Sequence, residues 1–144
     1  MNNKVYELKN GEGYIKEYDF KGKLIFEGEY LNGFRNGKGK EYYHDKLEFE
    51  GEYLYSQKLS GKNYIDGKLE YEGEYLYNKK WNGKGYDNNG NIVYELKNGT
   101  GKVKEYYDHS IFLKFVGEYL NGRRNGKGIE YGDITQGNGC CTRQ

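Results

Sequence analysis

The sequence has no proline, one tryptophan and two histidines, and its aliphatic residues are scarce. A mean hydropathy of −1.13 excludes a thick hydrophobic core. No apolar run approaches the roughly 20 residues that span a membrane, and the first residues lack the apolar segment of a signal peptide. We therefore expect a cytoplasmic protein with reduced thiols at Cys140 and Cys141.

Groups suited to catalysis are also few. His44 and His109 each follow a pair of tyrosines in equivalent predicted turns. Paired glutamates such as Glu27 and Glu29 recur in every full repeat, which favours a solvated sheet face over acid–base catalysis. The 23 basic and 22 acidic residues nearly balance, so nothing indicates nucleic-acid binding. We predict no enzyme activity, no catalytic residue, no metal and no cofactor.

What the chain has instead is 23 glycines and 18 tyrosines, arranged in a repeat. The segment from Phe26 to Gly39 returns almost unchanged from Phe115 to Gly128. Looser copies begin at Phe49 and Tyr71, and shortened copies begin at Tyr6 and Tyr94. A period of about 22 residues is typical of a solenoid or array. It predicts six units over roughly residues 5–132.

Each unit has the pattern of a β-hairpin. Phe26, Gly28 and Tyr30 alternate with Glu27 and Glu29, which places aromatic and acidic side chains on opposite faces of a strand. Asn-Gly pairs then reverse the chain, because both residues tolerate positive φ. Stacked hairpins would bury aromatic rings between units, and a glycine between two aromatics would leave room for a ring to lie across the backbone.

These motifs resemble the MORN repeat (membrane occupation and recognition nexus). The resemblance rests on Phe26-Glu-Gly28-Glu-Tyr30 with Gly37-Lys-Gly39, and on equivalent residues from Tyr71 to Gly85 and from Phe115 to Gly128. The unit at Phe49 departs from the pattern, with Asn63 in place of the second glycine. The resemblance implies an all-β fold: an elongated, twisted, single-layer antiparallel sheet of consecutive hairpins. It also implies a protein-binding scaffold, with some members found at membranes or phosphoinositides and some dimerising end to end.

The first functional hypothesis is a non-enzymatic scaffold that binds partner segments along an aromatic-lined groove. The predicted groove residues are Phe26, Tyr30, Phe49, Tyr53, Tyr71, Tyr75, Trp81, Phe115 and Tyr119. The single tryptophan lies at a predicted turn, where it either anchors a partner or packs on the next hairpin.

The alternative is a peripheral membrane protein that binds anionic lipid headgroups or phosphoinositides. Basic side chains recur at the turns and would align along one edge of a regular array. They are Arg35, Lys38, Lys79, Lys80, Lys84, Arg123, Arg124 and Lys127. A solubilising edge that discourages strand pairing is the simpler interpretation of the same residues.

Two domains are expected, a repeat domain over residues 1–132 and a flexible tail over residues 133–144. The tail ends in Cys141-Thr-Arg-Gln144, which has the outline of a prenylation box, with Cys140 as an adjacent palmitoylation candidate. An open array also has two sheet ends, so a homodimer through these ends is predicted.

Overall fold

The computed structural model describes residues 3–5, 8–132 and 142–143, and these residues form strands and turns without a helix. The strands are β1 (Asn3–Val5), β2 (Gly13–Tyr18), β3 (Leu24–Leu31), β4 (Phe34–Tyr43), β5 (Lys46–Leu54), β6 (Gln57–Ile65), β7 (Lys68–Leu76), β8 (Lys79–Tyr86), β9 (Ile92–Leu96), β10 (Gly101–Tyr106), β11 (Leu113–Leu120), β12 (Arg123–Tyr131) and β13 (Thr142–Arg143). The predicted tail falls mostly on residues 133–141 and 144, and these lie outside the described part with Cys140 and Cys141.

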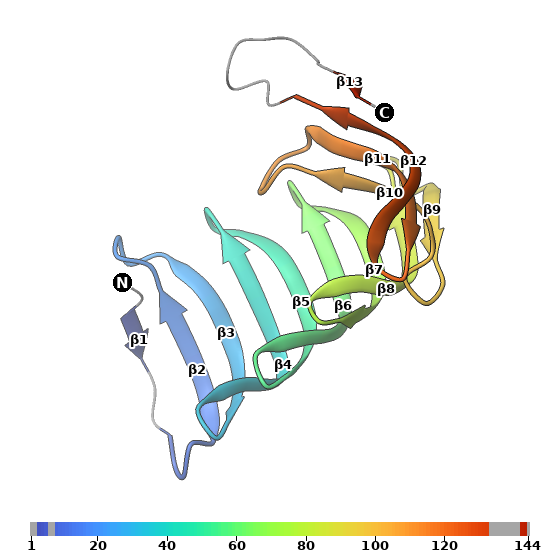
Figure 1. Cartoon of the computed structure of the whole chain (residues 1–144). Coiled ribbons are helices and arrows are strands. Elements are labelled where there is room, and N and C mark those ends of the chain that lie inside the picture. The colour runs from blue at the N-terminus through green and yellow to red at the C-terminus, as the bar shows by residue number, and fades with distance from the viewer. Residues whose placement is uncertain (1–2, 6–7, 133–141, 144) are drawn as a thin grey trace.

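Strands that follow one another in the sequence pair antiparallel, except β9 and β10, so consecutive hairpins lie side by side along the array (Figure 1). Strands β1–β9 form one sheet and β10–β13 form a second. The division falls at the shortened unit of Tyr94, where an isolated bridge between Lys97 and Thr100 closes the turn from β9 to β10. The predicted fold, an open antiparallel sheet of consecutive hairpins, is confirmed.

One edge of the array consists of two-residue turns in which both residues have positive φ. In the first full unit these are Asn32 (φ 51°) and Gly33 (φ 82°), as the Asn-Gly pattern predicts. Hydrogen bonds link each turn to the next hairpin: the Tyr55 N–H donates to Asn36 Oδ1 at 3.1 Å, and the Asn98 N–H donates to Asn82 Oδ1 at 2.7 Å. The turn edge therefore fixes the spacing of the units.

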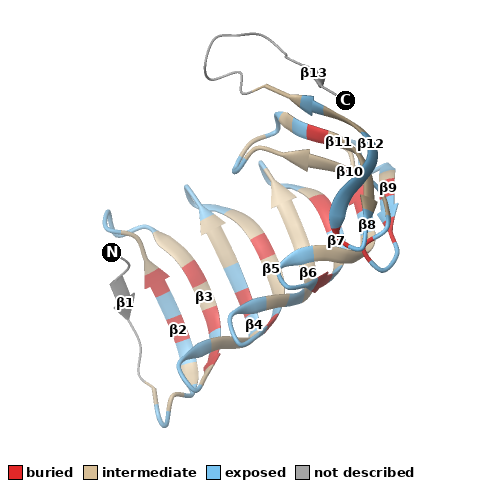
Figure 2. Ribbon diagram, in the orientation of Figure 1, coloured by how far each residue is buried: buried red, intermediate tan, exposed pale blue. Residues whose placement is uncertain are grey.

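The glycines inside the strands make room for aromatic rings. A Cβ on Gly39 would lie 2.8 Å from the Phe26 ring of the preceding strand and 3.0 Å from the Tyr53 ring of the following one. Real Cβ atoms do not approach neighbours this closely, so the rings require glycine beneath them. Buried positions repeat from strand to strand as a result (Figure 2).

A second regular feature is a β-bulge immediately before each aromatic residue. Glu17 pairs with Phe26 but Tyr18 pairs with Leu24, so Ile25 is passed over in the ladder. The corresponding residues of the later units are Glu48, Glu70, Val93 and Lys114. A bulge redirects the extra side chain, and Glu70, which is bulged, is buried on the same side as the aromatic rings.

Candidate functional site

The aromatic residues predicted to line a groove form the core instead. Phe26, Phe49 and Tyr71 are completely buried, and Tyr53 is 3% exposed. Tyr30, Tyr75 and Phe115 are also buried, whereas Tyr119 is only partly so. The cause is interdigitation: the Tyr53 ring lies edge-on to both Phe26 and Phe49, with ring centroids 5.6 Å apart in each case. These rings hold one hairpin against the next and leave no open groove between them.

Cationic side chains cover the outer side of these rings. The guanidinium carbon of Arg35 lies 3.9 Å from the centroid of Phe26, and Lys58 Nζ lies 4.3 Å from that of Phe49. Lys80 and Arg124 lie over Tyr71 and Phe115 in the same way. Arg35, Lys80 and Arg124 were predicted to lie on a free basic edge, so this placement corrects the prediction.

Buried or half-buried carboxylates neutralise these cations. Arg35 contacts Glu17 at 2.9 Å and Glu41 at 3.0 Å. Lys80 pairs with the buried Glu70, and the Tyr94 hydroxyl donates to the same carboxylate at 2.5 Å. Burial, reinforced by the negative charge of Glu70, raises the pKa of Tyr94 far above its usual value. A cation held in this way is a structural element rather than a free anion-binding group.

The remaining predicted basic residues do not form a single stripe. Lys38 and Lys84 face away from the aromatic rings, opposite Glu52 and Glu72 of the adjacent strands. Lys127 has the same place in the second sheet, where its backbone N–H donates to Glu118 at 2.8 Å. Lys79 and Arg123 begin β8 and β12 at the turn edge. The eight basic residues are therefore divided among three surfaces.

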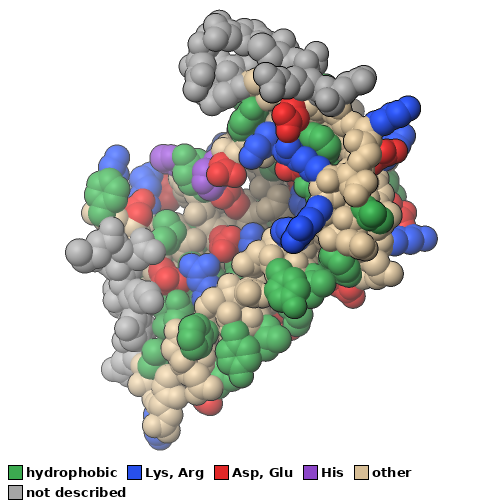
Figure 3. All heavy atoms as spheres, in the orientation of Figure 1, with side chains coloured by type: hydrophobic (Ala, Val, Ile, Leu, Met, Phe, Trp, Pro, Cys, Tyr) green, Lys and Arg blue, Asp and Glu red, His purple; other side chains and the backbone are tan. Residues whose placement is uncertain are grey.

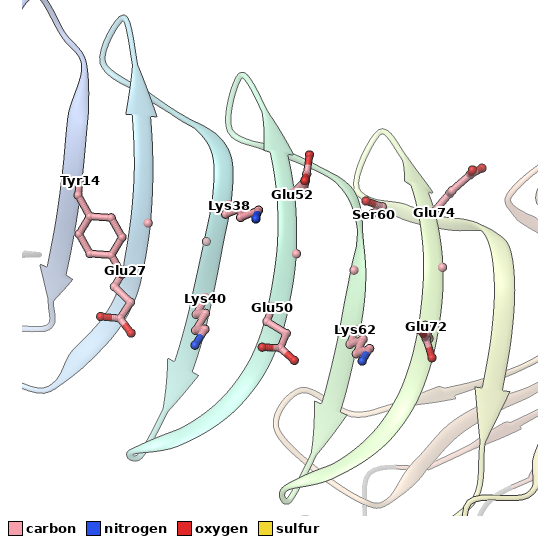
Figure 4. A pocket seen from close by; sticks show the side chains of 15 residues that line it. Tyr14, Glu27, Lys38, Lys40, Glu50, Glu52, Ser60, Lys62, Glu72 and Glu74 are labelled. Atoms are coloured by element: carbon pink, nitrogen blue, oxygen red, sulfur yellow. The ribbon is translucent and has the colours of Figure 1, made fainter.

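An open hollow lies on the face opposite the aromatic rings. This trough has a volume of about 600 Å³ and crosses strands β2–β7. Its floor is glycine backbone, and charged side chains stand on both sides of that floor (Figure 4). The residues lining it are Tyr14, Glu27, Gly28, Lys38, Gly39, Lys40, Glu50, Gly51, Glu52, Ser60, Gly61, Lys62, Glu72, Gly73 and Glu74.

Strand register orders the charges of the trough. Glu27 is opposite Lys40, Lys40 is opposite Glu50, and the alternation continues through Lys62, Glu72 and Lys84. This confirms that the repeated glutamates lie opposite lysines on neighbouring strands. In all, five glutamates and three lysines line the trough, and four of the five glutamates lie on β5 and β7.

Tyrosine hydroxyls fix two of the glutamates in this face. Tyr42 donates to Glu27 at 2.7 Å, and Tyr64 donates to Glu50 at 2.8 Å. Partial burial and the accepting carboxylates raise the pKa of each of these tyrosines to about 12. These hydrogen bonds hold the carboxylates of Glu27 and Glu50 in place, so a binding partner would not have to order them.

Trp81 packs at the turn edge, where the first sheet meets the second. Its ring lies against Gly99 and Gly122, and its backbone carbonyl accepts a hydrogen bond from the Gly99 N–H at 2.8 Å. Of the two predicted roles, packing on a neighbouring hairpin is the one that the contacts indicate.

The turn edge carries exposed apolar side chains. Hydrophobic groups gather along this edge in Figure 3, and Tyr77 at a hairpin turn is 75% exposed. Phe34, Leu54, Tyr55, Leu76 and Leu120 belong to the same edge. Within residues 3–5, 8–132 and 142–143, no helix is long and apolar enough to cross a membrane.

The fold defines a class of protein, an open all-β repeat array with charged and aromatic faces. Within that class, residues 26–47 and 115–133 match the family model of the MORN repeat, so the chain carries MORN repeats at these two positions. MORN repeats generally mediate interactions with proteins or membranes and are a non-enzymatic type of repeat. Comparison with curated proteins found no match.

Proposed function

We propose that this protein is a non-enzymatic interaction module that binds an extended segment of a partner protein in the glycine-floored trough. The trough itself is the observation that carries the proposal. It crosses six strands, and at ~4.8 Å per strand it is about 24 Å long, enough for about seven extended residues. Bare backbone on its floor lets a partner chain approach closely, and the side chains beside the floor can select its charge.

Charge complementarity favours a basic partner segment. Glu50, Glu52, Glu72 and Glu74 surround the single lysine Lys62 on the β5–β7 part of the trough. Lysine or arginine residues of a bound peptide would pair with the carboxylates that face solvent, and opposite charge would also accelerate the encounter. The cytoplasm is the expected location of such a complex.

Selection from a random peptide library displayed on phage tests this proposal. Recovered peptides should be rich in lysine and arginine, and their affinity should fall by about tenfold or more in a Glu52→Lys, Glu72→Lys variant. Glu95→Lys is the matched control, because Glu95 extends the same row of charges on β9 beyond the trough. Peptides without basic residues, or equal loss in both variants, would contradict the proposal.

Membrane association is a second candidate, and the exposed turn edge is the observation that favours it. Tyr77 and Leu120 are exposed there beside Lys79 and Arg123, a combination of apolar and basic groups that suits an anionic headgroup region. Sedimentation with phosphatidylserine or phosphoinositide vesicles should then be lost in a Lys79→Glu, Arg123→Glu variant. Unchanged sedimentation would exclude this edge. Lipidation of Cys140 or Cys141 remains a separate proposal.

Association between copies of the chain is a further proposal. The sheets do not close: β1 pairs with β2 alone and β13 with β12 alone among the described strands. A free strand edge can pair with another chain. Light scattering across a range of concentrations should detect a dimer, and a strictly monomeric mass at the highest concentration would contradict it.

A further inference from the structure

Two distant parts of the array meet at a single histidine. His109, in the loop between β10 and β11, stacks on Tyr43 at the end of β4, with ring centroids 3.6 Å apart and planes inclined by 7°. His109 Nδ1 also lies 2.7 and 2.8 Å from the two carboxylate oxygens of Glu48. Glu48 is the bulged residue of its unit, and it is 61 positions away in sequence. These contacts join the second sheet to the middle of the first.

The contacts of His109 with Tyr43 and Glu48 form a junction between the two sheets. Hollows adjoin this junction, so it is not closely packed. One of about 390 Å³ is lined by His44, Asp66 and Phe112 among others, and one of about 290 Å³ lies between the same loop and the side chains of Lys58 and Glu70. The strand ladder does not bridge the two sheets, since β9 and β10 are partners of β8 and β11 respectively. Segments with few buried contacts open at low free-energy cost.

We propose that residues 107–112 form a strap, fastened by His109 to Tyr43 and Glu48, that closes the second sheet over the first and loosens when the imidazole loses its proton. Residues 97–100, the turn between the two sheets, would act as the hinge. The strap governs access to the hollow that contains Lys58 and Glu70, on the side opposite the trough. This inference is therefore independent of the proposed peptide binding.

The chemistry of the junction gives the direction of the response. Histidine is the side chain whose charge changes between about pH 5 and 8. A protonated ring makes a charge-assisted hydrogen bond to Glu48 and a cation–π contact with Tyr43, and both weaken when the ring is neutral. The strap should therefore be tight in mild acid and looser in mild base.

Other charged and titratable groups also face the contacts of His109. They include five carboxylates and three ammonium groups, together with a second imidazole and several phenols. From all the packed elements these are Glu41, Glu48, Asp66, Glu70, Asp108, Lys46, Lys58, Lys80, His44, Tyr43, Tyr64, Tyr106 and Tyr107. Lys58 and Lys80 are already paired with Glu41 and Glu70. Lys46 is paired with Asp66 as well, so each of the three ammonium groups has a carboxylate partner.

Spin labels on the two sheets measure the opening directly. We suggest labelling Lys21→Cys and Lys102→Cys in a full chain carrying Cys140→Ser and Cys141→Ser. Both positions are exposed, the first in the turn between β2 and β3 and the second on β10. The distribution of distances should be narrow at about pH 5.5 and should broaden to longer distances at about pH 8.5. An identical distribution at both pH values would overturn the proposal.

Three variants assign the response to the strap. His109→Gln should give the broad distribution at both pH values, and so should Glu48→Gln. His44→Gln is the matched control, because His44 lies in the turn beside Tyr43 and its edge-on ring makes a different contact. Retention of the pH response in His109→Gln, or its loss in His44→Gln, would refute the assignment. The emission of Trp81 checks that each variant is folded.

Discussion

The guanidinium carbon of Arg35 lies 3.9 Å from the centroid of the Phe26 ring, and carboxylates of Glu17 and Glu41 hold the same guanidinium from either side. Comparable cations cover the aromatic rings of other units. The thin core of this array is thus enclosed by ion pairs, which makes its stability sensitive to single charges.

Replacing Arg35 by alanine should lower the free energy of unfolding by about 2–4 kcal/mol, because the buried Glu17 and the half-buried Glu41 would lose their ion pairs with Arg35. Arg35→Lys should cost about 1 kcal/mol, since Lys58 and Lys80 occupy the equivalent place in other units. Urea denaturation followed by Trp81 fluorescence measures both. The control is Arg123→Ala at the turn edge, and an equal effect of Arg35→Ala and Arg123→Ala would contradict this role.

A methyl group on Gly51 should destabilise the protein by about 3 kcal/mol. The added Cβ would lie 2.1 Å from the Ser60 carbonyl oxygen and 2.7 Å from the Gly61 Cα, and backbone atoms cannot move aside. Gly67 has φ +79° but no neighbour within 4 Å, so Gly67→Asn should cost less than about 1 kcal/mol. Thermal unfolding of the two variants compares them. Similar losses would mean that backbone conformation, not space, dictates these glycines.

Stability should decline in alkali between about pH 10 and 12. Folding raises the pKa of Tyr42 and of Tyr64 from 10.0 to about 12, through partial burial and hydrogen bonds to Glu27 and Glu50. A raised pKa means that the folded state retains protons that the unfolded state releases, so the contribution is complete below pH 10 and is lost toward pH 12. Denaturant titrations at several pH values should show this decline. A Tyr42→Phe, Tyr64→Phe variant should decline less steeply, and an unchanged slope would contradict the assignment.

Truncating Trp81 should weaken the connection between the two sheets. Trp81→Ala removes the ring that lies against Gly99 and Gly122, and the loss should be about 2–4 kcal/mol for this half-buried side chain. Hydrogen exchange should quicken in β10–β12 more than in β3–β6. Phe20→Ala, at a side chain that is 74% exposed, is the control. Uniform acceleration over all strands would contradict a local role.

Much of this architecture could be predicted from the residues, because local pattern determines it. Alternation of Phe26 with Glu27 separates the two faces, and the Asn32–Gly33 pair specifies a two-residue turn. That turn also places Arg35 opposite Tyr30, on the aromatic face. Strand register alone therefore predicts that Arg35 lies on the aromatic face. The prediction of a single basic edge along the turns did not take this register into account.

Other features depend on packing between distant residues. The distance in space between neighbouring hairpins decides whether the aromatic rings cover each other or line a groove. The number of residues between Phe26 and Tyr53 in the sequence does not predict that distance. The contact of His109 with Tyr43 and Glu48 depends on how the second sheet turns at residues 97–100. No local pattern around His109 distinguishes it from His44, since both follow tyrosine pairs in turns.

The bulge before each aromatic residue allows one position to vary between units while the residues that stack the hairpins stay constant. Glycines and rings must be nearly identical from unit to unit for the hairpins to stack, whereas the bulged position carries Ile25, Glu48, Glu70, Val93 and Lys114 in successive units. One residue per hairpin can thus be exchanged without disturbing the ladder. The array therefore combines a constant framework of glycines and aromatic rings with one variable position per hairpin. A new side chain could be introduced at that position in one unit at a time.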